Sequence, residues 1–123
     1  MRRLAGTLGV AFAALAAATS ASPATTGTSL TVTPSSVHRG HVVTIRGNAG
    51  DCPSGDAVTI ISRAFAHTHD FAGVPAVFAK VHAHGSFSTT TRIPSTKHVA
   101  HYKITARCGG GNLGIVAHLY VLA

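Results

Sequence analysis

The stretch that decides the fold, residues 77–93, reads VFAKVHAHGSFSTTTRI. In its first half Val77, Ala79 and Val81 alternate with longer or polar side chains, and in its second half Phe87 and Ile93 share one parity. Side chains alternate between the two faces of a strand, so this pattern predicts strands over 77–84 and 86–93, each with one apolar face. His84 and Gly85 form the turn between them.

The same period of two continues on both sides of this stretch. It predicts further strands over residues 29–33, 41–47, 57–63, 98–108 and 113–122. Residues 65–76 are less regular and contain Gly73 and Pro75, which is typical of an edge strand followed by a loop. Residues 109–112, Gly-Gly-Gly-Asn, predict a hairpin turn. The fold class expected is therefore all-β, a sandwich of about seven antiparallel strands.

The first two dozen residues have the layout of a secretory signal peptide. Arg2 and Arg3 precede an uncharged apolar run over residues 4–18, and small residues follow it. We expect cleavage of a leader over residues 1–24, after Ala21 or Ala24, which leaves one domain over residues 25–123. The apolar run is too short to cross a bilayer of roughly 30 Å, and we expect no membrane span further along. The protein is thus predicted to be secreted and extracellular.

The chain has two cysteines, Cys52 and Cys108. In an exported chain, two thiols are expected to oxidise to one disulfide, because the compartment is oxidising. The alternative is a nucleophilic cysteine. Neither thiol has a catalytic partner at a diagnostic spacing, so the sequence favours the disulfide.

Basic residues outnumber acidic ones after the leader. Three aspartates (Asp51, Asp56 and Asp70) oppose eight lysines and arginines, a net charge of about +5 with neutral histidines. This balance favours an anionic partner such as a cell-wall polymer, although an unknown protein partner is equally open. The basic residues are spread singly and aromatic residues are scarce, so nucleic acid is not expected as a partner.

Several short motifs together resemble a known family. They are Leu30 to Ser36 (LTVTPSS), Gly40, residues 42–47, Cys52-Pro53, Gly85 to Ser88 (GSFS), Ile93-Pro94, and residues 102–110. Their order is similar to that of small immunoglobulin-like domains in exported actinobacterial proteins. The resemblance implies an immunoglobulin-like sandwich that serves as a surface, adhesive or spacer module. Tyr102 resembles the tyrosine that secures the entry to its strand, although it lies further from Cys108 than in antibody domains. The cysteine placement departs from antibody-type domains, where the bridge joins two strands across the core; in this chain the bridge should tie the loop after the second strand to the end of the penultimate one.

A second resemblance is narrower. Residues 32–47 are similar to the opening of the neocarzinostatin-type apoproteins, sandwich proteins that carry an enediyne chromophore. That likeness implies a small-molecule carrier as a further alternative. The family normally has two disulfides, and the single cysteine pair of this chain departs from that pattern.

Nine histidines make the composition unusual. His67 and His69, close to Asp70, and His82 and His84 form two His-x-His pairs; each pair on a strand would present two imidazoles to one face. If the pairs were neighbours, these five residues would suit Zn or Cu. His98, His101 and His118 form a looser group. The competing interpretation is that the histidines are polar residues on outward faces, which gain charge as the pH falls below about 6.5 and then strengthen binding to anionic polymers.

The inventory for catalysis is thin. The chain has no glutamate, and Asp51 and Asp56 flank Cys52-Pro53-Ser54-Gly55 as turn formers do. No nucleophile elbow, His-Glu-x-x-His helix or phosphate-binding loop occurs. We therefore expect a secreted, non-catalytic immunoglobulin-like binding module without a resident cofactor. A histidine-mediated Zn or Cu binding protein is the alternative.

Overall fold

The computed structural model describes residues 27–123 of the 123-residue chain. The predicted leader, with its cleavage after Ala21 or Ala24, lies outside the described residues. The described part contains nine strands: β1 (Ser29–Thr33), β2 (Ser36–His38), β3 (Val42–Asn48), β4 (Ala57–Ile61), β5 (His69–Phe71), β6 (Val74–Lys80), β7 (Ser86–Arg92), β8 (Ala100–Cys108) and β9 (Gly111–Leu122). A short 3-10 turn, η2 (Ala83–Gly85), lies between β6 and β7.

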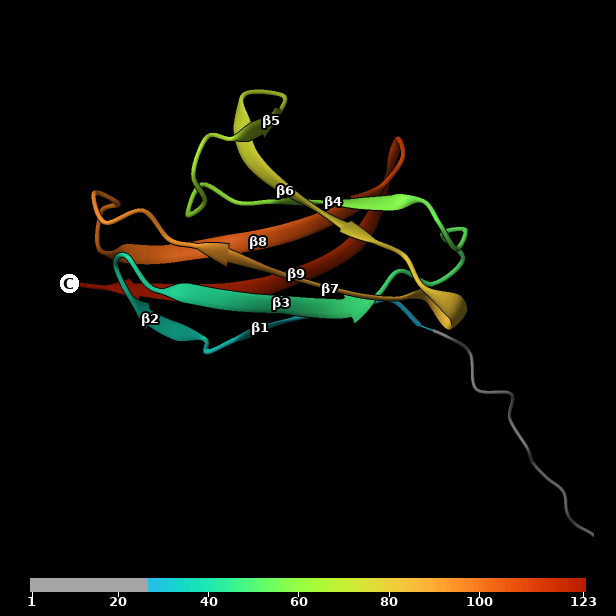
Figure 1. Ribbon diagram of the computed structural model, residues 1–123, viewed down its shortest axis with the longest axis horizontal. Coiled ribbons are helices and arrows are strands. Elements are labelled where there is room, and N and C mark those ends of the chain that lie inside the picture. Colours follow the sequence, from blue (N-terminus) through green and yellow to red (C-terminus); the bar gives the residue numbers. More distant parts are fainter. Residues whose placement is uncertain (1–26) are drawn as a thin grey trace, which may run out of the picture.

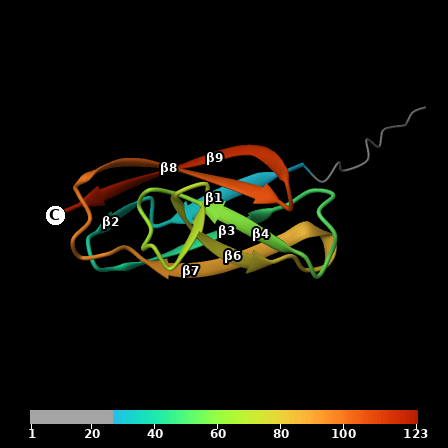
Figure 2. The ribbon, with the colours of Figure 1, turned by 90° about the horizontal axis from the view of Figure 1, so that it is seen from above.

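The strands form two sheets, so the all-β prediction is confirmed. One sheet has three strands in the order β1-β3-β7, and the other has six in the order β2-β9-β8-β4-β6-β5. Figure 1 shows β3 and β7 on one side of the molecule, with β4 and β8 on the other. Seen from above, the strands of both sheets follow the same long axis (Figure 2).

The expectation of about seven antiparallel strands is wrong in two respects. The described residues form nine strands, and β2 pairs with β9 in parallel, with Val37 opposite Val121. The extra strand arises where the chain leaves β1 at Pro34. Proline has no N–H to donate to a ladder. The pairing of β1 with β3 therefore ends at Thr33, and residues 36–38 join the other sheet.

The core lies between the sheets and follows from the alternation in the sequence. Val43 and Ile45 of β3 face inward from the three-stranded sheet, and Ile60, Ile104 and Leu119 face inward from the six-stranded sheet. Their side chains are fully buried. A side chain of this size contributes roughly 1.5–3 kcal/mol when it is removed from water, so the inner faces are the main stabilising term.

The strand predicted over residues 77–84 is shifted. β6 begins at Val74 and ends at Lys80, because Val81 and His82 already belong to the connection to β7. That connection closes on itself: Gly85 N donates to His82 O (3.1 Å), and His82 N donates to Ser86 O (2.8 Å). The irregular stretch 65–76 does contain the predicted edge strand, β5, which pairs only with β6.

The hairpin predicted at the glycine run is present between β8 and β9. Cys108 faces Gly111 in the ladder, so Gly109 and Gly110 form the turn. Near the start of β8, the Tyr102 hydroxyl donates to His98 O at 2.7 Å, four residues upstream. Within residues 27–123, no helix has the length and apolar character that a membrane crossing needs.

Candidate functional site: two outer faces and a histidine column

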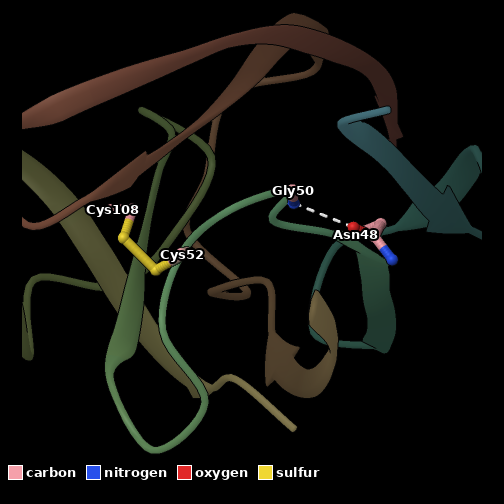
Figure 3. The surroundings of a disulfide bond; sticks show 4 residues. All are labelled: Asn48, Gly50, Cys52 and Cys108. Atoms are coloured by element: carbon pink, nitrogen blue, oxygen red, sulfur yellow. Dashed lines mark hydrogen bonds between the residues drawn. A yellow bond between two sulfur atoms is a disulfide. The ribbon is translucent and has the colours of Figure 1, made fainter. Parts of the chain in front are cut away.

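The disulfide joins Cys52 to Cys108, as the sequence predicts, with Cα atoms 6.0 Å apart. It ties the loop after β3 to the end of β8 (Figure 3). Asn48 holds the start of this loop: its Oδ1 accepts from Gly50 N and its Nδ2 donates to His84 O, each at 2.8 Å. Ligand atoms of Cys52, Asp56 and Cys108 also lie within 4.8 Å of one another. Both sulfur atoms are bonded to each other, however, so neither offers a thiolate to a metal ion.

The first predicted His-x-His pair lies at the edge of the six-stranded sheet. His67 precedes β5, and its Nδ1 is 2.9 Å from Asp70 Oδ1. His69 begins β5, and its ring packs on Phe78 of β6 with centroids 4.9 Å apart. The two imidazoles therefore have separate partners.

The second pair lies at the other end of β6. His69 is opposite Ala76 near the start of β6, whereas His82 and His84 follow its last residue, Lys80. At about 3.3 Å per residue, this separates the pairs by on the order of 20 Å. His84 has a φ of 65° inside η2, so this pair is on a turn and not on a strand. The five predicted ligands thus do not meet at one ion. The length of β6 separates His69 from His82, because His69 lies beside the start of that strand and His82 follows its end.

A different group of histidines is brought together by β8 and β9. His101 Nε2 lies 2.8 Å from His118 Nδ1, and the two rings meet edge to edge, with centroids 4.8 Å apart and planes inclined by 23°. His101 also stacks on Tyr120, with centroids 4.6 Å apart and planes inclined by 18°. We call Tyr120, His101 and His118 the histidine column. The sequence grouped two of its members, but His98 is linked to this region only through its carbonyl.

The outer face of the six-stranded sheet carries the column. We call it the ring face, and it consists of the outward residues His69, Phe71, Phe78 and Lys80 of β5 and β6, Thr59 and Ile61 of β4, His101, Lys103, Thr105 and Arg107 of β8, and Val116, His118, Tyr120 and Leu122 of β9. Large apolar side chains are exposed on it: Phe78 (47%), Val116 (50%), Tyr120 (50%) and Leu122 (38%).

The six-stranded sheet curls toward this face. The Arg107 guanidinium of β8 lies 4.9 Å from the ring centre of Phe71 on β5. Two strands separate β8 from β5, which in a flat sheet places their backbones about 14 Å apart. Figure 1 shows β5 and the start of β6 standing away from the rest of the sheet. Beside the curl is an open hollow of about 320 Å³, whose lining includes Ile61, His101 and Lys103.

The outer face of the three-stranded sheet has another chemistry. We call it the hydroxyl face, and it consists of Ser29, Thr31, Thr33, Val42, Thr44, Arg46, Asn48, Ser86, Ser88, Thr90 and Arg92. Seven of these residues are serine or threonine. An open hollow of about 550 Å³ is lined in part by Thr31, Arg46 and Ser88. His82 and Phe87 also line this hollow, although neither is one of the outward strand residues of the hydroxyl face.

Within residues 27–123, none of the three aspartates stands on either face. Asp51 and Asp56 lie in the loop between β3 and β4. Asp70 points to the opposite side of β5 from His69 and Phe71, since side chains alternate along a strand. Each outer face therefore presents basic side chains without an aspartate among them.

Comparisons with known proteins show similarity at the level of fold. No protein-family model matches the chain. No curated protein matches it either. Among solved structures it resembles part of an alkylpurine DNA glycosylase of Pseudomonas fluorescens, which was solved bound to DNA with an abasic-site analogue. The TM-score is 0.51 at 18% sequence identity, and the match covers 76% of this chain and 29% of the glycosylase chain.

Proposed function

We propose that the protein is a secreted, non-catalytic immunoglobulin-like module that binds an anionic extracellular polymer through the ring face. The single observation that carries this is the composition of the ring face: exposed rings and aliphatic side chains stand among Lys80, Lys103 and Arg107, with no aspartate among them. A face that is basic and partly apolar complements a polymer with charged groups along an otherwise less polar backbone.

The immunoglobulin-like part of the proposal rests on topology. One N-terminal segment is divided between the two sheets, as β1 and β2, and the disulfide-bonded β8 lies between β9 and β4. The bond from Tyr102 to His98 O is similar to the tyrosine corner of such domains, where a tyrosine near the start of a late strand bonds to backbone upstream, although Tyr102 lies further from the second cysteine than in antibody domains. Secretion is supported by the leader in the sequence and by the disulfide, which persists in oxidising compartments.

The experiment compares one charge reversal on each face. The oxidised protein, expressed from the full sequence, is titrated with sulfated dextran and with uncharged dextran of equal length. Lys103→Glu alters the ring face and Arg46→Glu alters the hydroxyl face; both side chains are exposed, and both stand on central strands of their sheets. We expect Lys103→Glu to weaken binding about tenfold, which corresponds to about 1.4 kcal/mol, and Arg46→Glu to have a much smaller effect.

Three outcomes would contradict the proposal. Equal losses in both variants would show that net charge, and not the ring face, determines binding. Equal affinity for the uncharged dextran would remove the anionic partner. Duplex DNA serves as a third probe, because DNA is the molecule bound in the structure of the glycosylase; a clear preference for it over sulfated dextran would replace the polymer with nucleic acid.

A further inference from the structure

The histidine column is produced by the register of β8 and β9. His101 lies directly opposite Tyr120, and Lys103 lies directly opposite His118. His101 and His118 are therefore diagonal neighbours on one face of an antiparallel pair, a separation that long and aromatic side chains can bridge. Both side chains are exposed to water.

The two imidazoles are already close enough to share one atom. His101 Nε2 and His118 Nδ1 are 2.8 Å apart, and one hydrogen lies between them in the metal-free protein. Stacking on Tyr120 and the hydrogen bond from its Nε2 position to His118 together restrict rotation of the His101 ring. The two nitrogens are thus held near each other before any ligand arrives, which lowers the entropic cost of binding one.

The chemistry of the pair selects the class of ion. Imidazole nitrogens without a carboxylate suit Cu, Ni and Zn, whereas Ca²⁺ and Mg²⁺ need oxygen ligands. With metal–nitrogen bonds of about 2.0 Å, two nitrogens at a right angle are about 2.8 Å apart, and two at a tetrahedral angle are about 3.3 Å apart. The observed separation is that of a hydrogen bond, and both rings are exposed, so a modest rotation of each ring turns both nitrogens toward one ion at either of these separations.

We propose that His101 and His118 form a surface site for a divalent transition ion, with Cu(II) preferred, held by these two imidazoles and completed by water. Cu(II) stands above Ni(II) and Zn(II) in intrinsic affinity for such ligands. Binding displaces the hydrogen between the two nitrogens. That proton moves to the other nitrogen of its ring through solvent, so both imidazoles stay neutral and each donates one electron pair.

Lys103 opposes binding at this site. Lys103 is opposite His118 in the ladder, and no aspartate on the ring face offsets its charge. Two positive charges near a surface repel each other, and salt screens the effect. Replacing Lys103 by alanine is therefore expected to tighten Cu(II) binding by several-fold. Lys103 is expected to favour binding of an anionic polymer. Its replacement by alanine should therefore strengthen Cu(II) binding and weaken polymer binding.

The experiment is a titration of the oxidised, metal-free protein with Cu(II), followed by electron paramagnetic resonance. We expect one ion per chain and an axial spectrum with splitting from two nitrogens. His118→Ala and His101→Ala should each weaken binding by at least about tenfold, since loss of even an outer-shell partner commonly costs that much. The matched control is the double variant His67→Ala/His69→Ala, which removes two exposed histidines of the other predicted group.

Circular dichroism and the unfolding midpoint establish that each variant folds, which is expected because the replaced side chains are exposed. The proposal is overturned if His118→Ala binds Cu(II) as the unaltered protein does. It is also overturned if the control variant His67→Ala/His69→Ala loses as much affinity for Cu(II) as His118→Ala does. Failure of sulfated dextran to bind would leave this site unaffected, so the two proposals are tested separately.

Discussion

The two outer faces of the molecule follow the same alternation and carry opposite chemistry. On the hydroxyl face, short serine and threonine side chains cover β1, β3 and β7 around two arginines. On the ring face, Phe78, Tyr120 and three histidines stand above β5, β6, β8 and β9 among basic residues. A regular period of two produces a buried inner face in both sheets, but it places no demand on what faces water.

The difference teaches where to look for function in such a domain. Scattered apolar residues on a surface are ordinary, but a curled face that gathers rings, aliphatic side chains and basic groups together is not. Short hydroxyl side chains form their hydrogen bonds with water and with nearby backbone, as Thr31 does when it donates to Arg46 O at 3.3 Å. The ring face is therefore the better candidate for a partner.

Loss of the disulfide should have the largest effect on the stability of the two sheets that carry these faces. Cys52 lies on the connection between the two sheets and Cys108 on the six-stranded one, 56 residues apart. Closing a loop of this length contributes about 4 kcal/mol in the chain-entropy model. The variant Cys52→Ala/Cys108→Ala should lose stability of this order, measured by urea unfolding at equilibrium. The unaltered protein under reducing agent is the control. If it kept its full stability, the disulfide would contribute nothing to holding the two sheets together.

A second change is directed at the three-stranded sheet. Gly47 of β3 faces inward, and a Cβ there would lie 2.9 Å from Phe87 Cζ and would overlap Ser29 O. Gly47→Ala should therefore cost about 1–3 kcal/mol through overpacking. Amide hydrogen exchange should rise first in β1 and β3. Gly110→Ala, where a Cβ meets nothing within 4 Å, is the matched control. Protection lost evenly across both sheets would mean that the sheets do not respond separately.

The smallest effect on stability is expected from a change at Tyr102, near the start of β8. Tyr102→Phe removes the hydroxyl that donates to His98 O, a single hydrogen bond worth about 1 kcal/mol. We expect a lowered unfolding midpoint, with Cu(II) binding at the histidine column unchanged. A loss of several kcal/mol would show that Tyr102 has a larger structural role than this one bond, and an unchanged midpoint would show that the bond contributes nothing.

Strand positions were accessible to sequence reasoning wherever an apolar period was bounded by turn residues. β1 has the predicted bounds, and the hairpin from β8 to β9 is present, although β9 begins at Gly111 and not at Leu113. The predicted strand boundaries were wrong where polar residues continued the alternation beyond the last hydrogen-bonded residue, as at His82 and His84 after β6. The pattern also gave no sign of β2, since three residues are too few to show a period. Phe65, placed in an irregular stretch, is fully buried because a turn at Ser62 directs it inward.

The sequence by itself determined the all-β class, the inward residues and the cysteine pairing, because these depend on alternation along one strand and on there being two cysteines. It did not determine which strands are neighbours or how far each sheet curls, because those depend on contacts between distant segments. Only the tertiary structure therefore separated the pair at His67 and His69 from the pair at His82 and His84. The register of β8 against β9, which no local pattern encodes, brought His101 to His118 and Tyr120.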